Sequence, residues 1–371
     1  MTNLMALSAD QVKALNYEEQ FIAKKQCLTT LIEPFYTDNI DAFQSPEKHY
    51  RMRAEFRIWH QGADTYHIMF DQTTKEQYKV NTLPSACSLI NDAMQIAIAL
   101  IINSPVLRVK LFQIDYLATT TNEIVISLLY HKKLSDEWSQ HANLLINELL
   151  HLGNINLIGR ARKQKVVVGN DFVTEKLVIK NNLYSFKQIE NSFTQPNAAI
   201  NIKMIEWVID NIEQPDTDLL ELYCGAGNFS IPLSHYFKKV LATEISKTSV
   251  NAAQLNIKAN NIDNLVIARL SSEEFVEAYN KMRAFNRLAN IDLDSYNFTT
   301  VLVDPPRAGL DDTTLDLISR FDTIIYISCN PTTLISNVAK LAPTHKPIKV
   351  ALFDQFPFTH HMESGVIMQK R

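Results

Sequence analysis

The stretch DLLELYCGAGNFSIPLSHYFKKVLATE, from Asp218 to Glu244, decides the fold of this chain. Leu219 to Tyr223 is a short apolar run of the kind that forms a buried parallel strand. Two glycines follow at once, and Asn228 can cap the first free N–H groups of a helix. A second apolar run then ends on the acidic Glu244. The order strand, glycine turn, helix, strand and acid predicts a nucleotide-type binding site.

The glycine turn has the pattern G-x-G, made by Gly225 and Gly227, and Ser230 occupies the next position of the dinucleotide fingerprint. Glycines let a ligand approach the backbone closely, and an acid about 20 residues further on can accept hydrogen bonds from a ribose. Because the third glycine is missing, a single nucleoside with a polar tail fits this turn better than a dinucleotide. Taken alone, G-x-G could also be an ordinary turn with incidental glycines.

The composition points to a well-packed protein of two or three domains, with 371 residues, 46% apolar residues and a net charge of −4. No secretory signal and no apolar stretch long enough for a bilayer is visible, so we expect a cytoplasmic protein without a membrane partner. The cysteines form no C-x-x-C pair, which argues against disulfides, a zinc site or an iron–sulfur cluster. They are Cys27, Cys87, Cys224 and Cys329.

Apolar runs alternate with helical segments from Asn197 onward, which predicts an α/β domain over residues 191–371 with a doubly wound, mostly parallel sheet. A loop and not a helix joins the final two strands, so the last strand should be antiparallel. Ligands of such sheets bind at the carboxyl ends of the strands. The expected strands are Leu219–Tyr223, Val240–Thr243, Leu265–Ala268, Thr299–Val303, Thr323–Ile327, Val350–Phe353 and Gly365–Met368.

Residues 1–190 are predicted to form an N-terminal α+β domain, with a helical lead-in to about residue 36 and then the order ββ-α-ββ-α-β. Its expected strands include Leu111–Ala118, Glu123–Tyr130 and Leu177–Ile179. In HYRMRAEFRIW (His49–Trp59) three arginines alternate with apolar residues, which suggests a strand with phosphate or RNA contact on one face. An exposed sheet face is the alternative. Residues Ile155–Lys187 hold seven basic and two acidic residues, which could follow phosphates or form the solvated face of a hairpin.

Three reactive side chains lie close to the ends of predicted strands: Asp304 and Cys329 follow a strand, and Glu363 lies in the loop before the last one. Asp304 opens DPPR, where two prolines stiffen the loop. Cys329 lies beside a helix start, where the helix dipole can lower a thiol pKa, so it is the candidate nucleophile. Glu363, in THHMESG, is the candidate general base. A metal site at His360, His361 and Glu363 is disfavoured, because no further ligand cluster has metal spacing.

Together these motifs resemble the RNA uracil-5-methyltransferase family, within the class I S-adenosylmethionine-dependent methyltransferases. The similar segments in the C-terminal half are SFTQPN (Ser192–Asn197), LELYCGAGNFS (Leu220–Ser230), Thr243-Glu244, VDPPRAGL (Val303–Leu310), YISCNP (Tyr326–Pro331) and THHMESG (Thr359–Gly365). HYRMRAEFRIW and LFQIDY (Leu111–Tyr116) extend the resemblance to the N-terminal half, which favours the branch that acts on tRNA.

The resemblance implies methyl transfer from S-adenosyl-L-methionine to C5 of the T-loop uridine, tRNA position 54, giving 5-methyluridine through a covalent adduct of cysteine with uracil C6. It makes Cys329 the nucleophile and Glu363 the proton acceptor. The cofactor contacts that it implies are Gln195, Tyr223, Asn228, Glu244 and Asp304, and the RNA-binding candidates are Arg51, Arg57, Phe112 and His131.

The resemblance further implies that the T-arm of tRNA is the partner and that tmRNA is a second RNA. We expect no metal, no iron–sulfur cluster and no obligatory protein partner. Methylation of ribosomal RNA is the alternative within the family. Two other classes stay open from the residues alone. A nicotinamide-dependent oxidoreductase would need the third glycine, which Ser230 replaces. A non-catalytic RNA-binding protein would have no need of Cys329 and Glu363 at strand ends.

Overall fold

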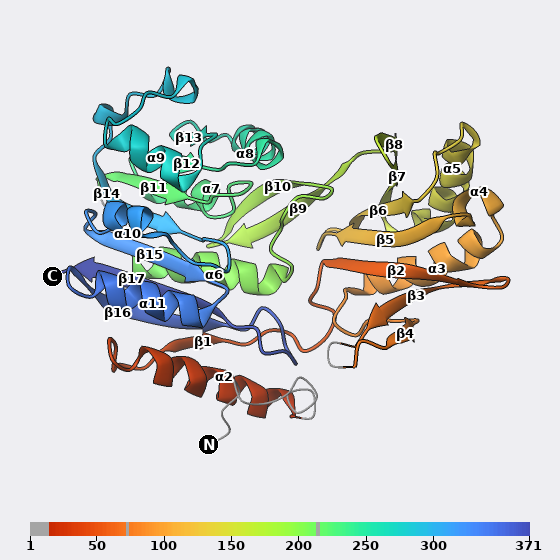
Figure 1. The fold of residues 1–371 in the computed structure, drawn as a ribbon, viewed down its shortest axis with the longest axis horizontal. Helices are drawn as coiled ribbons and strands as arrows, with labels where there is room; N and C mark the ends of the chain where they lie inside the picture. The colour runs from red at the N-terminus through yellow and green to blue at the C-terminus, as the bar shows by residue number, and fades with distance from the viewer. Residues whose placement is uncertain (1–14, 72–73, 213–215) are drawn as a thin grey trace. The chain divides into compact units, whose positions relative to one another are not determined.

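A computed structural model describes residues 15–71, 74–212 and 216–371 of the chain. The chain divides into two compact units, whose elements are labelled in Figure 1. The first unit comprises Met1–Ser45, Val178–Tyr184 and Ala199–Arg371. The second comprises Pro46–Leu177 and Ser185–Ala198.

An eight-stranded sheet forms the first unit, in the order β1-β16-β17-β15-β14-β11-β12-β13. Neighbouring strands are parallel, except that β17 is antiparallel to both β15 and β16. This confirms the predicted doubly wound, mostly parallel sheet with an antiparallel last strand. The strands are β1 (Asp41–Phe43), β11 (Asp218–Leu222), β12 (Lys239–Thr243), β13 (Leu265–Ala268), β14 (Phe298–Val303), β15 (Thr323–Ser328), β16 (His345–Phe353) and β17 (Glu363–Lys370).

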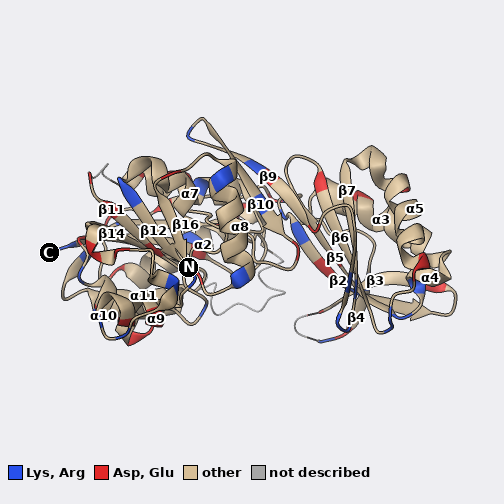
Figure 2. Ribbon diagram, turned by 90° about the horizontal axis from the view of Figure 1, so that it is seen from above, with Lys and Arg blue, Asp and Glu red and all other residues tan. Residues whose placement is uncertain are grey.

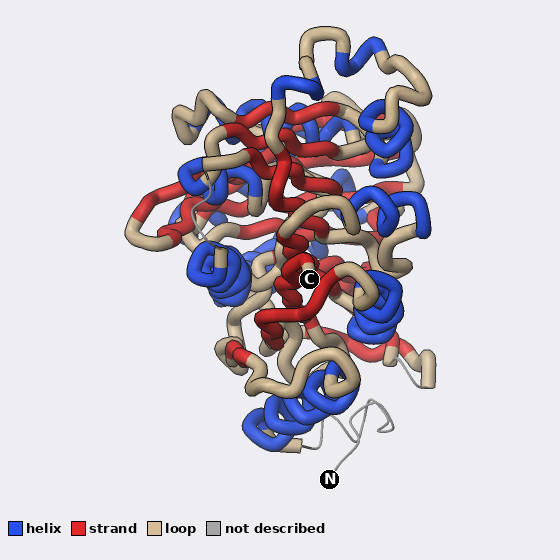
Figure 3. Tube along the Cα trace, turned by 90° about the vertical axis from the view of Figure 1, so that its left-hand side faces the viewer, coloured by secondary structure: helices blue, strands red, loops and turns tan. Residues whose placement is uncertain are grey.

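Helices cover both faces of this sheet, as Figure 3 shows. The central strands are therefore buried on both sides, and all five residues of β11 are buried. The α-helices are α2 (Tyr17–Ile32), α6 (Ala198–Asn211), α7 (Ser230–Leu233), α8 (Lys247–Ala259), α9 (Ser272–Tyr279), α10 (Asp312–Ile318) and α11 (Pro331–Leu341). The 3₁₀ turns η3 (Ser234–Tyr236), η4 (Asn286–Leu288) and η5 (Leu293–Ser295) accompany them.

The N-terminal segment belongs to this first unit and not to the α+β unit that the sequence suggested. β1 adds a parallel edge strand to β16, with Asp41 opposite Ala351. α2 buries Leu28 and Ile32 in the same hydrophobic core as the sheet. A single boundary between residues 190 and 191 therefore does not separate the two compact units. The reason is that α2, near the start of the chain, buries its apolar face against a sheet formed mainly by the C-terminal half.

The second unit is built on a seven-stranded sheet in the order β4-β3-β2-β5-β6-β7-β8, antiparallel except for the pair β6–β7. Its strands are β2 (Arg53–Gln61), β3 (Asp64–Phe70), β4 (Gln77–Val80), β5 (Leu111–Ala118), β6 (Glu123–Tyr130), β7 (Asn154–Ala161) and β8 (Gln164–Val168). Its helices are α3 (Ser88–Ile102), α4 (Pro105–Arg108), α5 (Glu137–Leu149) and the 3₁₀ turn η2 (Leu150–Leu152). The predicted α+β architecture is confirmed, although β4 was not expected.

A two-stranded sheet, β9 (Phe172–Ile179) with β10 (Asn182–Ile189), completes the structure. Lys180 and Asn181 join the strands with φ values of 48° and 66°, as a type I′ hairpin turn requires. Only the end of β9 was predicted from the sequence, and β10 was not expected. Each strand has residues in both compact units.

Candidate active site

The carboxyl ends of the central strands of the first unit form one edge of its sheet. Leu222 at the end of β11 is opposite Thr243 of β12 on one side and Val303 of β14 on the other. Tyr326 of β15 is opposite Val303 in turn. This register brings the residues that follow these strands to a common edge, where ligands of doubly wound sheets bind.

The glycine turn after β11 has the backbone that the G-x-G pattern predicts. Gly225 and Gly227 have φ values of +57° and +88°, which residues other than glycine rarely adopt. A Cβ added at Gly227 would lie 2.9 Å from Cδ1 of Ile231, whereas the corresponding position at Gly225 is open. The backbone of Gly225 is thus accessible to a ligand, as a nucleoside site at this turn requires. Cys224, which precedes Gly225, is buried.

Glu244 closes the same turn from β12. One of its carboxylate oxygens accepts a hydrogen bond from the Gly225 N–H at 3.1 Å, and the other accepts one from the Ser246 N–H at 2.6 Å. As a residue, Glu244 is half-buried. A carboxylate in this place can accept hydrogen bonds from the two hydroxyls of a ribose.

Asn228 does not cap a helix, which corrects the expectation from the sequence. Helix α7 begins only at Ser230, after a turn. The side-chain amide of Asn228 instead exchanges two hydrogen bonds of 2.8 Å with that of Asn201 in α6. The pair orients the Asn228 amide, and no pattern in the sequence pointed to Asn201 as its partner.

Tyr223 directly follows β11 with a φ of +64°, a conformation that is uncommon for a tyrosine. Its hydroxyl lies 2.6 Å from the Ser272 hydroxyl at the start of α9. Such strain persists where surrounding contacts enforce it, and it is concentrated at functional sites. Like Asn201, which bonds to Asn228, Ser272 is a partner of a predicted site residue that no pattern in the sequence indicated.

Asp304 and Glu363 are two carboxyl groups at this edge, the first half-buried and the second buried. Burial raises the pKa of Asp304 to about 7. Burial, and next the negative charge of Asp304, raises the pKa of Glu363 well above its ordinary value, against the opposing effect of Arg307. The Glu363 residue is only 6% exposed. Each carboxyl is a stronger base, once ionised, than an exposed one.

Cys329 is half-buried and directly follows β15. Burial raises the pKa of its thiol, the charges of Glu363 and Asp304 raise it further, and Arg307 lowers it. The net shift is upward, so the lowered pKa expected from the start of α11 is wrong. The reason is that burial and two carboxyl groups act against the helix end.

The loop after β14 is tied to the loop that holds Cys329. The backbone carbonyl of Arg307 accepts hydrogen bonds from Asn330 Nδ2 at 3.0 Å and from Thr333 Oγ1 at 3.3 Å. The Asn330 side chain also caps α11 by accepting the Thr332 N–H. The loops that carry Arg307 and Cys329 are therefore held together, and Arg307 is a charged group near Cys329 that was not among the residues predicted for the site.

Gln195 belongs to the second unit, in the half-buried segment that follows β10. In that unit, three of the four RNA-binding candidates come together: Arg57 in β2, Phe112 in β5 and His131 directly after β6. The ring of Phe112 stacks on that of His131 with 3.9 Å between centroids, and the guanidinium of Arg57 lies 5.5 Å from the Phe112 centroid. Arg57 projects from the exposed face of β2, while Ala54, Phe56 and Ile58 are buried on the other face, as the alternation predicted.

Arg51 is not part of this cluster, because it precedes β2. Its backbone bridges Ala86 and Asn197, and its side chain donates to the Arg53 carbonyl at 2.6 Å. Figure 2 shows Lys and Arg positions in blue along β9 and β10. The basic residues of Ile155–Lys187 are partly neutralised. Ion pairs join Arg160 to Glu190, Lys165 to Asp171 and Lys180 to Asp210. These pairs favour the structural interpretation of that basic stretch.

Two properties of the described ranges bear on other kinds of site. Within residues 15–71, 74–212 and 216–371, no three His, Cys, Asp or Glu side chains gather as a metal site would need. In that same part of the chain, no helix has both the length and the apolar character to cross a membrane.

Comparison with known proteins gives consistent matches over nearly the whole chain. A family model described as tRNA (uracil-5-)-methyltransferase matches residues 16–371. A relative from Pseudoalteromonas atlantica, named tRNA/tmRNA (uracil-C(5))-methyltransferase, is 54% identical over 97% of this chain and 99% of its own length. Relatives with the same name from Proteus mirabilis and Haemophilus influenzae are 52% and 54% identical, each over 96% of this chain and 98% of its own length.

A solved structure shares the fold. The Pyrococcus abyssi tRNA (uracil-54, C5)-methyltransferase in complex with S-adenosyl-L-homocysteine matches with a TM-score of 0.73 and 18% identity. The match covers 95% of this chain and 82% of that one.

Proposed function

Because the chain belongs to the tRNA (uracil-5-)-methyltransferase family, we propose that it transfers a methyl group from S-adenosyl-L-methionine to C5 of the T-loop uridine of tRNA, forming 5-methyluridine. The uridine is the one at tRNA position 54, the position that the name of the Pyrococcus abyssi enzyme gives for its own uracil. tmRNA is a second substrate, in keeping with the names of the relatives. A tRNA substrate also implies the cytoplasm as the place of action.

The observation that supports this function most directly is the ladder between β15 and β17. Ser328 is opposite Ser364, and Cys329 and Glu363 are the next residues toward the same sheet edge. A thiol and a carboxyl group side by side are what methylation of uracil at C5 needs, because C5 alone is a poor nucleophile. The glycine turn and Glu244 lie at the carboxyl ends of β11 and β12 on that edge.

In the proposed reaction, the Cys329 thiolate adds to C6 of uracil, and the C5=C6 electron pair moves toward C5 and O4. C5 then attacks the methyl group that S-adenosyl-L-methionine supplies, and the methyl–sulfur bond breaks, which leaves S-adenosyl-L-homocysteine. Glu363 then removes the proton from C5, the C5–H electrons re-form the C5=C6 bond, and the C6–S bond breaks to release the thiolate. Glu363 is buried and has a raised pKa, so its carboxylate form is a strong base for this step.

The other site residues are proposed to bind the two substrates. Glu244 would hold the ribose hydroxyls of S-adenosyl-L-methionine, and Tyr223, Asn228, Asp304 and Gln195 would complete its binding. The second unit would bind the T-arm, with Arg57, Phe112 and His131 as a stacking platform and Arg51 as a further contact. The target uridine must leave its stack to reach Cys329, as in other enzymes that modify bases.

The test is methyl transfer from labelled S-adenosyl-L-methionine to an unmodified tRNA transcript, with nucleoside analysis of the digest. 5-Methyluridine in the T-loop is the expected product. Label in ribosomal RNA but not in tRNA would keep the chemistry and overturn the substrate. No label in either RNA, with S-adenosyl-L-methionine shown to bind, would overturn the proposed reaction.

A further inference from the structure

A connection of nine residues, 354–362, leads from β16 into Glu363, the first residue of β17. Phe353 and Glu363 are opposite each other at the two ends of this connection. The placement of Glu363 therefore depends on the path of the segment, which we call the base loop. Within the base loop, the Thr359 hydroxyl donates to the Phe356 carbonyl at 2.8 Å and accepts the His361 N–H at 3.2 Å.

The backbone of the base loop is strained at its centre. Phe358 has a φ of +59°, a left-handed conformation that carries a steric cost for an aromatic residue. Such a conformation persists only where neighbouring groups enforce it. The internal hydrogen bonds of Thr359 do not involve the Phe358 peptide groups, so other elements must hold this turn.

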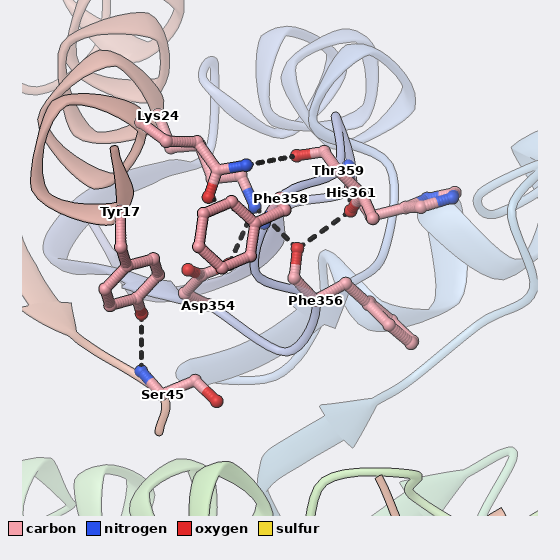
Figure 4. A network of polar contacts seen from close by, with 9 residues as sticks. Tyr17, Lys24, Ser45, Asp354, Phe356, Phe358, Thr359 and His361 are labelled. Atoms are coloured by element: carbon pink, nitrogen blue, oxygen red, sulfur yellow. Dashed lines mark hydrogen bonds and ion pairs between the residues drawn. The ribbon is translucent and has the colours of Figure 1, made fainter. Parts of the chain in front are cut away.

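Helix α2, more than 300 positions earlier in the chain, supplies those contacts (Figure 4). The Gln20 side chain accepts the Phe358 N–H at 2.9 Å and donates to the Thr359 carbonyl at 3.5 Å. It thus binds the backbone on both sides of the strained residue. The Tyr17 ring packs against the Phe358 ring with 5.8 Å between centroids.

Lys24 anchors the start of the base loop. Its ammonium group donates to Asp354 Oδ1 at 2.7 Å and to the Phe356 carbonyl at 2.9 Å. Both partners of the ion pair are completely buried, with 0% exposure of either side chain. A buried ion pair adds little net stability compared with apolar packing, but it demands one geometry, because either charge left alone would be costly.

Tyr17, Gln20 and Lys24 are spaced three and four residues apart, so they lie on one face of α2. That face makes two hydrogen bonds, two ammonium contacts and one ring contact to the base loop. Apolar side chains would bury equal area without fixing the backbone path. The polar contacts of Gln20 and Lys24 therefore indicate that this face of α2 fixes the backbone path of the base loop and does not serve stability alone.

We propose that Gln20 and Lys24 of α2 are positioning residues for methyl transfer, which hold the base loop so that Glu363 reaches the C5 proton of the covalent adduct. This inference rests on the proposed function. Loss of either side chain would let the base loop relax at Phe358, and it would slow removal of the proton more than the formation of the Cys329–C6 bond.

The test compares full-length Lys24→Met and Gln20→Met with wild-type protein, with Gln26→Met as the matched control on the exposed side of the same helix. Methionine keeps the unbranched shape and removes the polar group. Turnover on tRNA should fall about 10- to 100-fold in both variants, the scale of a misplaced catalytic group. S-Adenosyl-L-methionine binding should stay unchanged, and the fraction of enzyme covalently joined to RNA on a denaturing gel should rise, as in Glu363→Gln.

A merely structural role predicts a different pattern. Variants that are folded by circular dichroism, yet lose turnover without accumulating the covalent species, would overturn the positioning role, and so would turnover equal to that of Gln26→Met. If Lys24→Met does not fold because Asp354 is left unpaired, Gln20→Met, which leaves no buried charge, decides the matter. Wild-type protein that methylates no uridine would instead overturn the proposed function itself.

Discussion

Ser328 of β15 and Ser364 of β17 face each other across the antiparallel ladder, so Cys329 and Glu363 are the next residues on their strands toward the same edge of the sheet. The relationship depends on the reversed direction of β17. In a parallel strand, a residue at the start of the strand would lie at the opposite edge. The antiparallel last strand thus brings a side chain from the start of β17 next to one from the end of β15.

Replacing Cys329 with alanine should reduce methyl transfer by a factor on the order of 10³ or more, because no covalent activation of the base is left. S-Adenosyl-L-methionine binding should be unchanged, since Cys329 follows β15 whereas the glycine turn follows β11. Cys27→Ala, at another half-buried free thiol, is the matched control and should keep full activity. Appreciable turnover by Cys329→Ala would rule out the covalent mechanism.

The Glu363→Gln variant should form the covalent adduct with RNA and fail to resolve it, because an amide cannot accept the C5 proton. Incubation with tRNA and S-adenosyl-L-methionine, followed by a denaturing gel, should show a slowly migrating species. The double variant with Cys329→Ala should not form it. If Glu363→Gln turns over at the wild-type rate, another group is the proton acceptor.

The Cys329 thiol should react slowly with iodoacetamide at neutral pH, because burial and the neighbouring carboxyl groups raise its pKa. Alkylation should increase as the pH rises, with a midpoint above that of an ordinary thiol. Glu363→Gln removes a negative charge and should move the midpoint to lower pH. Mass spectrometry of the Cys329 peptide measures both, and a midpoint that does not move would show that Glu363 exerts no field on the thiol.

We predict that the buried carboxyl group of Glu221 makes the stability of the protein depend on pH. Its side chain, in the fully buried β11, accepts a hydrogen bond from Ser230, and burial raises its pKa from 4.5 to about 8. The folded state keeps a proton that the unfolded chain releases, so the free energy of unfolding should fall as the pH rises from about 4.5 to 8. The limiting slope is about 1.4 kcal/mol per pH unit for one proton.

Urea unfolding of wild type and Glu221→Gln between pH 5 and 8 measures this contribution. The glutamine cannot titrate, so the stability of the variant relative to wild type should rise with pH. Asp304 and Glu363 act in the same direction in both proteins and cancel from the comparison. Identical pH dependence of the two proteins would show that Glu221 has an ordinary pKa.

We predict that replacing Phe112 lowers the affinity of the protein for RNA. Replacement by alanine removes the centre of the Arg57–Phe112–His131 stack and should weaken tRNA binding by about 1–3 kcal/mol, roughly 5- to 150-fold. Fluorescence anisotropy with a tRNA transcript measures this change. Tyr78→Ala, at an exposed aromatic residue of β4 in the same unit, is the control and should bind normally. Equal losses in the two variants would exclude a specific stacking platform.

Much of the fold could be read from local patterns, because apolar runs and glycine turns reflect interactions close in sequence. β5 and β6 begin and end at the residues that the sequence predicted. β1, β4 and β10 were missed, since they are short or lack strong alternation and form by pairing with other strands. Asn228 was assigned a cap because asparagine commonly caps helices, but its partner Asn201 lies in α6, which no local pattern could reveal.

Local chemistry was sufficient to single out Cys329, Glu363 and the glycine turn, because each motif carries its own constraint, such as a positive φ or a thiol at a strand end. Their charge states required the folded chain. Burial and the approach of Glu363 and Asp304 raise the thiol pKa that the helix start alone was expected to lower. The joining of α2 to the base loop is likewise a tertiary matter, because Lys24 and Asp354 are 330 positions apart and meet only when α2 packs on the sheet.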